Sequence, residues 1–357
     1  MRKTLKLAAA ATLFATPALA AVPNLENPLY APTAGEVYGK LGVGVMYKKA
    51  NDNQAMQDKG LVGETEFPIW RGNANIGVGI TDFLSVRGKF AYTHDGDIDR
   101  AGMNDGRLGL NFRASEFLPT DGWVWDIYAD AHLGGISEMK AQAIPTVYTP
   151  AQLVANPKLS PLTFSYDNYS NGRWGAWAGT QVGKTFDKVT VAAFAEVLRT
   201  FGNDNNTIEI TPAAKARLTS LGQGALVAVM PNSFSVDTAS TWEYSAGLNS
   251  LYQMDDTWSF GGGFTYKHRA ENAIDAVNIV ATIPAGQAGV DAFAKAFVGP
   301  MKDGIDEYIL SVVVANQLTD NVQVALYGEY TFDDAMAKSS NGTDIKAELG
   351  ARVNVRF

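Results

Sequence analysis

Residues 348–357, ELGARVNVRF, decide the fold class of this chain. Apolar and polar side chains alternate strictly along the stretch, as on the two faces of a β-strand. A terminal strand with one wholly apolar face, ending on an aromatic residue, is unusual in water. The stretch therefore predicts a strand that faces an apolar medium. Its apolar positions are Leu349, Ala351, Val353, Val355 and Phe357.

Residues 1–20, MRKTLKLAAAATLFATPALA, have the pattern of a secretory signal peptide. A basic start precedes a short apolar stretch, and small residues occupy positions 18 and 20. The apolar stretch is too short to cross a bilayer, and nothing after it continues as a buried helix. We expect cleavage after Ala20, export of the mature chain, and a periplasmic N-terminal segment over residues 21–33.

Composition narrows the class of protein further. The chain has 357 residues, 46% of them hydrophobic and 18% charged, and no cysteine, so no disulfide can support it. No later apolar run approaches the ~18 residues that a membrane helix needs. The formal net charge of −8 argues against nucleic acid as a partner. No linker or shift in charge divides the mature chain, which predicts one domain over residues 34–357.

Alternating segments recur along the chain, separated by short and long gaps in strict succession. The short gaps carry Asp, as tight turns prefer. This order predicts an all-β fold: a transmembrane antiparallel up-and-down β-barrel of twelve strands, with short periplasmic turns and long extracellular loops. The expected turns are residues 81–83, 115–122, 186–188, 254–257 and 318–321; the expected loops are 49–65, 95–106, 136–171, 201–240, 270–306 and 333–343.

Aromatic residues distinguish a membrane barrel from a soluble β-sandwich, which would also alternate. On the apolar face they gather at strand ends, for example Trp123 and Trp258 near turns and Trp70 and Trp242 near loops. Val, Leu, Ala and Gly lie between them. Two aromatic girdles around an aliphatic belt are expected where strands meet lipid headgroups and tails.

The chain thus resembles bacterial outer-membrane β-barrel proteins, although no specific family is indicated. In that group the last strand ends on an aromatic residue and is read by the barrel-assembly machinery. The resemblance implies an outer-membrane location, with lipid and that machinery as partners. It assigns the assembly signal to Phe357, Val355, Val353 and Leu349.

The polar faces of the strands are then predicted to line a lumen. Its charges fall into a mainly basic wall and a facing, mainly acidic wall. Inward-facing glycines, among them Gly42, Gly44 and Gly109, favour an open lumen because small residues leave volume. The basic residues are Lys40, Arg71, Arg87, Lys89, Arg107, Arg113 and Arg352, and the acidic ones are Asp126, Asp130, Glu196, Glu243 and Glu329.

Three long loops contain Pro-Ala helix starts, at Thr149, Thr211 and Ile283, followed by Ala-rich stretches and another Pro. Thr is a favourable N-cap and Pro suits the first helical position. We expect short helices there. Their apolar character suggests packing on each other, on the lumen mouth or on a partner.

Catalytic groups are expected to be absent. None of the three histidines stands two residues before a Ser, as in outer-membrane phospholipases. The pairs Asp95/Asp97 and Asp130/His132 resemble those of omptin proteases, but they lie one strand apart and in a barrel of twelve strands. No metal or cofactor motif occurs.

Two functions therefore stand above an omptin-like protease. One is a porin-like channel for small polar solutes, anionic or zwitterionic, carried by the charged lumen. The other is a barrel with a closed lumen that acts as a surface anchor or binding protein through its long loops.

Overall fold

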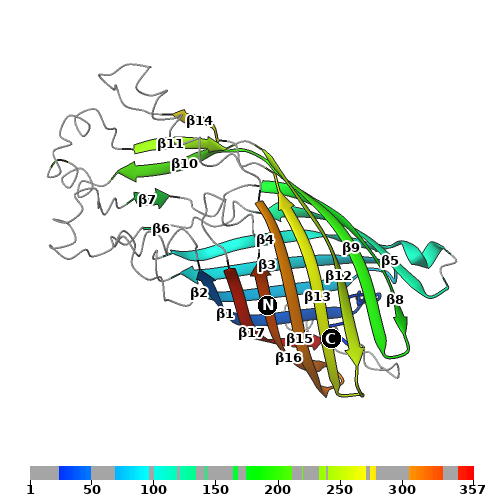
Figure 1. Cartoon of the computed structure of the whole chain (residues 1–357). Coiled ribbons are helices and arrows are strands. Elements are labelled where there is room, and N and C mark those ends of the chain that lie inside the picture. Colours follow the sequence, from blue (N-terminus) through cyan, green and yellow to red (C-terminus); the bar gives the residue numbers. More distant parts are fainter. Residues whose placement is uncertain are drawn as a thin grey trace, which may run out of the picture.

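The structure is a computed structural model whose main body is a closed antiparallel β-barrel (Figure 1). It describes residues 24–49, 69–95, 100–118, 121–133, 141–142, 164–167, 174–210, 219, 233–238, 240–270, 274–278, 305–332 and 345–357. The predicted signal peptide and the three predicted loop helices lie outside the described residues, apart from Thr219. Among the described residues, no helix is long and apolar enough to cross a membrane.

The barrel contains the twelve strands that the gap pattern predicts, and each pairs with its neighbours along the chain. They are β1 (Val37–Lys49), β2 (Ile69–Gly79), β3 (Leu84–Asp95), β4 (Arg100–Arg113), β5 (Trp123–Leu133), β8 (Trp174–Phe186), β9 (Val189–Thr200), β12 (Thr241–Gln253), β13 (Trp258–Arg269), β15 (Ile305–Thr319), β16 (Val322–Phe332) and β17 (Ile345–Arg356). The predicted fold class is confirmed.

Closure joins the last strand to the first. β17 runs antiparallel to β1, with Val353 opposite Leu41, and Phe357 and Val37 exchange two backbone hydrogen bonds at the turn end. No backbone edge of the barrel is then left without a partner strand, as a lipid environment requires. Short turns connect the hairpins. Asp121, Gly122 and Asp187 adopt positive φ there, which Asp and Gly tolerate best.

The outer surface of the barrel is apolar across its middle. Leu349, Leu326 and Leu41 are exposed by 72%, 66% and 65%, although a soluble protein would bury such residues. Trp123 and Trp258, which a soluble core would enclose, are exposed by 46% and 42% at the turn end. The aliphatic belt between two aromatic girdles is therefore present on the lipid-facing side.

The long loops contribute a second sheet that the sequence pattern does not predict. Its order is β14-β11-β10-β7-β6, and it lies beyond the loop end of the barrel (Figure 1). Its strands are β6 (Ala141–Gln142), β7 (Phe164–Asp167), β10 (Asn203–Ile210), β11 (Ser233–Thr238) and β14 (Ile274–Asn278), and a 3₁₀ helix spans Ala114–Phe117 before β5.

Candidate functional site: the barrel lumen and its N-terminal plug

The interior of the barrel carries the charges that the sequence assigns to a lumen. Each of the twelve predicted residues alternates with exposed apolar residues of its own strand, so each is on the inner face. On β4, for example, Arg107 and Arg113 alternate with the exposed Leu108, Leu110 and Phe112. The sequence does not indicate which of these charged side chains form ion pairs with one another.

The densest ion pairs join three adjacent strands. Arg87 of β3 donates two hydrogen bonds to Asp130 of β5, at 2.8 and 2.7 Å, and the Asp130 side chain is only 1% exposed. Arg113 of β4 binds Asp126 of β5 in the same two-pronged way, at 2.9 and 3.2 Å. Bidentate pairs of this kind hold both side chains against the wall.

The walls are therefore not arranged as predicted. Asp126 and Asp130 were expected on a wall facing the basic one, but the strand order puts β5 beside β4. Their carboxylates neutralise the neighbouring arginines instead of facing them across the lumen. The prediction failed because sequence spacing indicates which face a residue occupies, not how far its side chain extends along that face.

Aromatic rings lie flat among these charges. The Arg87 guanidinium lies 4.1 Å from the centre of the Tyr128 ring, and that of Arg107 lies 3.5 Å from the centre of Trp177. Tyr128 also donates a hydrogen bond of 2.6 Å to Glu196. Stacking on aromatic faces suits guanidinium groups, which are weakly hydrated.

Arg71 and Glu243 belong to two further groups of lumen charges. Arg71 contacts Glu348 at 3.1 Å, and Tyr327 donates to the same carboxylate at 2.9 Å. Glu329 lies opposite Glu348 in the β16–β17 register. Nearer the loops, Glu243 accepts from Lys267 at 2.8 Å and from Arg269 at 3.3 Å.

Inward glycines do not leave open volume, contrary to the prediction. At Gly44 a Cβ would lie 2.7 Å from the Tyr327 hydroxyl, and at Gly263 it would lie 2.7 Å from the Ser311 hydroxyl. At Gly109 it would collide with Asp130, whose side chain crosses β4 there to reach Arg87. These glycines provide flat surfaces on which long side chains of neighbouring strands lie.

Residues 24–30, here called the N-terminal plug, lie inside the turn end of the barrel. The sequence predicts only a periplasmic segment at this position. Leu25 and Leu29 are 2% and 6% exposed, and Leu29 packs against Gly183 of β8. The plug reaches strands around the circumference, namely β1, β4, β8, β9, β12, β16 and β17, through hydrogen bonds to Lys40, Arg113, Gln181, Thr190, Gln253, Gln323, Arg352 and Asn354.

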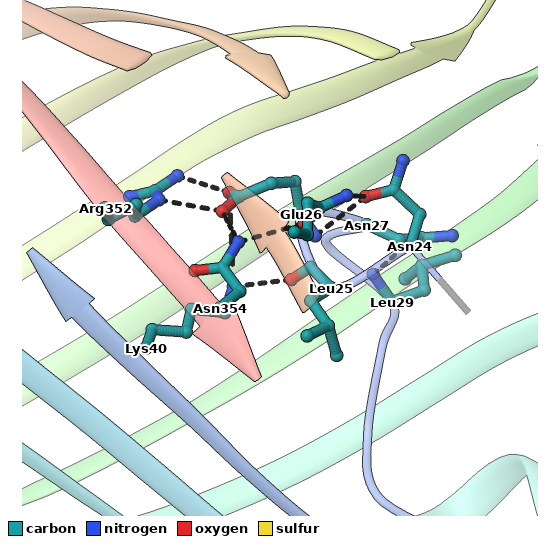
Figure 2. A network of polar contacts seen from close by, with 9 residues as sticks. Asn24, Leu25, Glu26, Asn27, Leu29, Lys40, Arg352 and Asn354 are labelled. Carbon is teal, nitrogen blue, oxygen red and sulfur yellow. Dashed lines mark hydrogen bonds and ion pairs between the residues drawn. The ribbon is translucent and has the colours of Figure 1, made fainter. Parts of the chain in front are cut away.

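Glu26 is the principal anchor of the plug (Figure 2). Its carboxylate accepts hydrogen bonds from Arg352, with Nε at 2.7 Å, and from Asn354 at 2.6 Å, and Lys40 Nζ lies 4.0 Å away. Burial by itself raises the pKa of this carboxyl, but Lys40, Arg352 and Asn354 outweigh burial and leave the pKa below its ordinary value. Glu26 is therefore held as a carboxylate.

Two side-chain turns shape the plug itself. Asn24 Oδ1 accepts from the Glu26 backbone N–H at 2.9 Å, and Asn27 Oδ1 accepts from that of Leu29 at 2.8 Å. Asn side chains commonly stabilise turns in this way. The turns direct Leu25 and Leu29 toward the barrel wall. Tyr30 packs edge-on against Tyr38 of β1, and most of the other plug contacts are polar.

The omptin-like pairs do not form a catalytic group among the described residues. Both Asp130 oxygens accept hydrogen bonds from Arg87. His94 and His268 alternate with inward residues and are on the outer face, where His268 contacts Asp306 at 2.7 Å. Asp97 lies outside the described residues. No group of three or more potential metal ligands occurs in the described ranges.

Comparison with known proteins gives the fold and no family. No family model and no curated protein matches the sequence. The COG4313 outer membrane channel from Pseudomonas putida F1 is similar with a TM-score of 0.51 and 14% identity, over 94% of this chain and 99% of that chain. The transport unit of the autotransporter AIDA-I from Escherichia coli is similar with a TM-score of 0.46 and 10% identity, over 99% of this chain and 97% of that chain. The NanC porin is similar with a TM-score of 0.43 and 8% identity, over 88% of this chain and 98% of that chain.

The chain is an outer-membrane β-barrel. The closed barrel, its exposed aliphatic belt and its aromatic girdles carry this conclusion, and the first comparison agrees with it in fold.

Proposed function

We propose that this protein is an outer-membrane channel for small polar solutes, anionic or zwitterionic, whose turn end is closed by the N-terminal plug until the plug moves. The observation that carries the proposal is the chemistry of the interior. Charged and amide side chains line it, and such a surface favours water and polar solutes over an apolar cargo.

The interface of the plug supports a movable closure. Leu25 and Leu29 are its two buried apolar residues, and the ring of Tyr30 packs edge-on against that of Tyr38 of β1. The remaining side-chain contacts described for the plug are mainly hydrogen bonds and ion pairs. Water can replace such contacts at a modest net cost, because each intramolecular hydrogen bond contributes only about 0.5–1.5 kcal/mol. A segment that closes a barrel permanently would be expected to bury more apolar surface.

The test is single-channel conductance in a planar bilayer. The full chain should show low conductance with brief openings, and a variant lacking residues 24–30 should conduct several-fold more. Both proteins must first show the heat-modifiable mobility of a folded barrel. A folded deletion variant that passes no current would refute the channel.

A second candidate function is supported by the five-stranded sheet of the loops. Strands in successive long loops, β6 and β7, β10 and β11, and β14, pair with one another beyond the barrel. An ordered surface there suits a binding protein whose barrel serves as an anchor. This function would replace the channel if the deletion variant proves closed.

A further inference from the structure

Arg199 of β9 carries a positive charge on the lipid-facing side of the barrel. It is at the loop end of its strand, between Leu198 and Thr200, whose buried side chains face inward. In the β9–β12 register it lies opposite Trp242, and its guanidinium lies 4.8 Å from the centre of that ring. Apart from this contact, the Arg199 side chain makes no hydrogen bond or ion pair within the part of the chain that the structure describes.

Most described arginines of the inner faces differ from Arg199, because carboxylates of the chain neutralise them. They are Arg71, Arg87, Arg113, Arg269, Arg352 and Arg356. Asp306 of β15 is on the outer face at the same end as Arg199, but β12 and β13 separate its strand from β9. Its carboxylate accepts a hydrogen bond from Tyr266 and contacts His268, each at 2.7 Å. Among the described residues, no carboxylate therefore neutralises Arg199.

The level of Arg199 along the barrel indicates which external group can meet it. The rings of Trp242 and Tyr244 stack with their centres 6.3 Å apart, and Tyr244 stacks on His268 at 6.4 Å. Rings of β12 and β13 thus continue the row that Arg199 begins on β9. The row belongs to the aromatic girdle at the loop end, where lipid headgroups lie and an arginine is tolerated better than at the middle of the bilayer. Since the long loops are extracellular, these headgroups are those of the outer leaflet.

We propose that Arg199, held on Trp242, binds the phosphate of a lipid headgroup in the outer leaflet. Guanidinium groups bind phosphate through two parallel N–H donors, and they are more weakly hydrated than ammonium groups. The exposed aliphatic surface below the girdle, which includes Leu248 of β12, accommodates the acyl chains. A free phosphate ion would make no contact with that surface, which favours a lipid as the ligand. The site is on the outer wall and does not depend on conduction through the lumen.

The test is native mass spectrometry of the folded full chain in a detergent without phosphate, with dioleoyl phosphatidic acid as the probe. The wild-type barrel should retain this lipid at concentrations at which dioleoylglycerol, which has the same acyl chains and no phosphate, is not retained. Arg199→Gln should raise the lipid concentration for half-occupancy by about tenfold or more, because hydrogen bonds to a charged group are lost. Arg199→Lys should raise it less, since it keeps the charge but not the paired donors. All variants must first show the heat-modifiable mobility of a folded barrel.

Lys184→Gln is the matched control, since Lys184 is a cation on the outer face of β8 at the opposite, turn end, where it binds the Asp121 carbonyl. It should bind phosphatidic acid as the wild type does. Equal binding by wild type and Arg199→Gln would overturn the site, and so would an equal loss in Arg199→Gln and Lys184→Gln, because any outer cation would then suffice. Displacement of the lipid by ammonium phosphate at equal concentration would assign the site to free phosphate and overturn the lipid as its ligand.

Discussion

The outer and inner faces of the same twelve strands differ in how their side chains make contacts. Outer side chains contact lipid one by one, whereas inner side chains contact one another in linked sets. On the outer face, residues such as Leu349 and Leu326 meet lipid individually, and their neighbours along the barrel are interchangeable aliphatic groups. On the inner face, Arg87, Asp130 and Gly109 come from three strands and form one unit. Outer residues should therefore respond to mutation singly, and inner residues in sets.

The largest effect is expected at the end of the outer face. Phe357→Asp places a charge on the lipid-facing side of the strand that closes the barrel, and it alters the residue proposed as the assembly signal. We predict a several-fold loss of heat-modifiable folded protein in the outer membrane and unfolded chains in the periplasm. Arg356→Gln, next to it on the inner face, should assemble normally. Equal yields from wild type and Phe357→Asp would contradict the assembly role.

The next effect tests the pairing of the inner face. Arg87→Gln leaves Asp130, which is 1% exposed, without its cation and should lower the free energy of unfolding by about 3–5 kcal/mol. Adding Asp130→Asn should recover part of that loss, which a double-mutant cycle in urea measures.

The outer-face counterpart is Arg199→Gln. Arg199 stacks on Trp242 at 4.8 Å, and its loss should cost less than about 1 kcal/mol. If Arg87→Gln and Arg199→Gln lower the free energy of unfolding by the same amount, the inner side chains do not depend on one another more than the outer ones do.

A smaller effect is expected from two glycines. Gly109→Ala puts a Cβ 2.6 Å from the Asp130 Cα on the inner face and should destabilise by about 1–3 kcal/mol. Gly72→Ala is the control on the outer face, where the nearest atom would be the Tyr92 Cβ at 4.0 Å. Urea midpoints of both variants measure the difference. An unfolding midpoint unchanged by Gly109→Ala would show that β5 and the Asp130 side chain shift to accommodate the added methyl group.

The smallest effect concerns pH and the plug. The pKa of Glu26 is lowered in the folded barrel, so the contribution of its contacts is complete above the ordinary value of 4.5 and is lost as pH falls through the lowered value. Channel openings should become more frequent at such acid pH.

Glu26→Gln should abolish this acid step. Asp255→Asn is the control, because the pKa of Asp255 is also lowered, by the backbone N–H groups of Trp258 and Thr257, in an exposed turn. Openings in that variant should still respond to acid. An acid step that persists in Glu26→Gln would assign it to another group.

The strand plan, the lipid-facing surface and the inner-face positions of the charges follow from the sequence alone. Alternation is local, because side chains two residues apart share a face whatever the rest of the chain does. The pattern that ends at Phe357 is therefore enough to predict the barrel, and the gap lengths are enough to predict its twelve strands. Arg87 and Lys89 were both recognised as inward-facing for the same reason.

Only the tertiary structure decided which of these charges are paired and where the N-terminal segment lies. Arg87 meets Asp130 because the side chain of Asp130 crosses Gly109, and Glu26 meets Arg352 across a separation of 326 residues. Such contacts depend on how far side chains reach across neighbouring strands and on the path of the N-terminal segment, which have no period in the sequence. Residues 24–30, NLENPLY, carry turn-forming Asn and Pro, two leucines, one tyrosine and one glutamate as signals. These do not distinguish a plug from an exposed linker until the barrel around them is known.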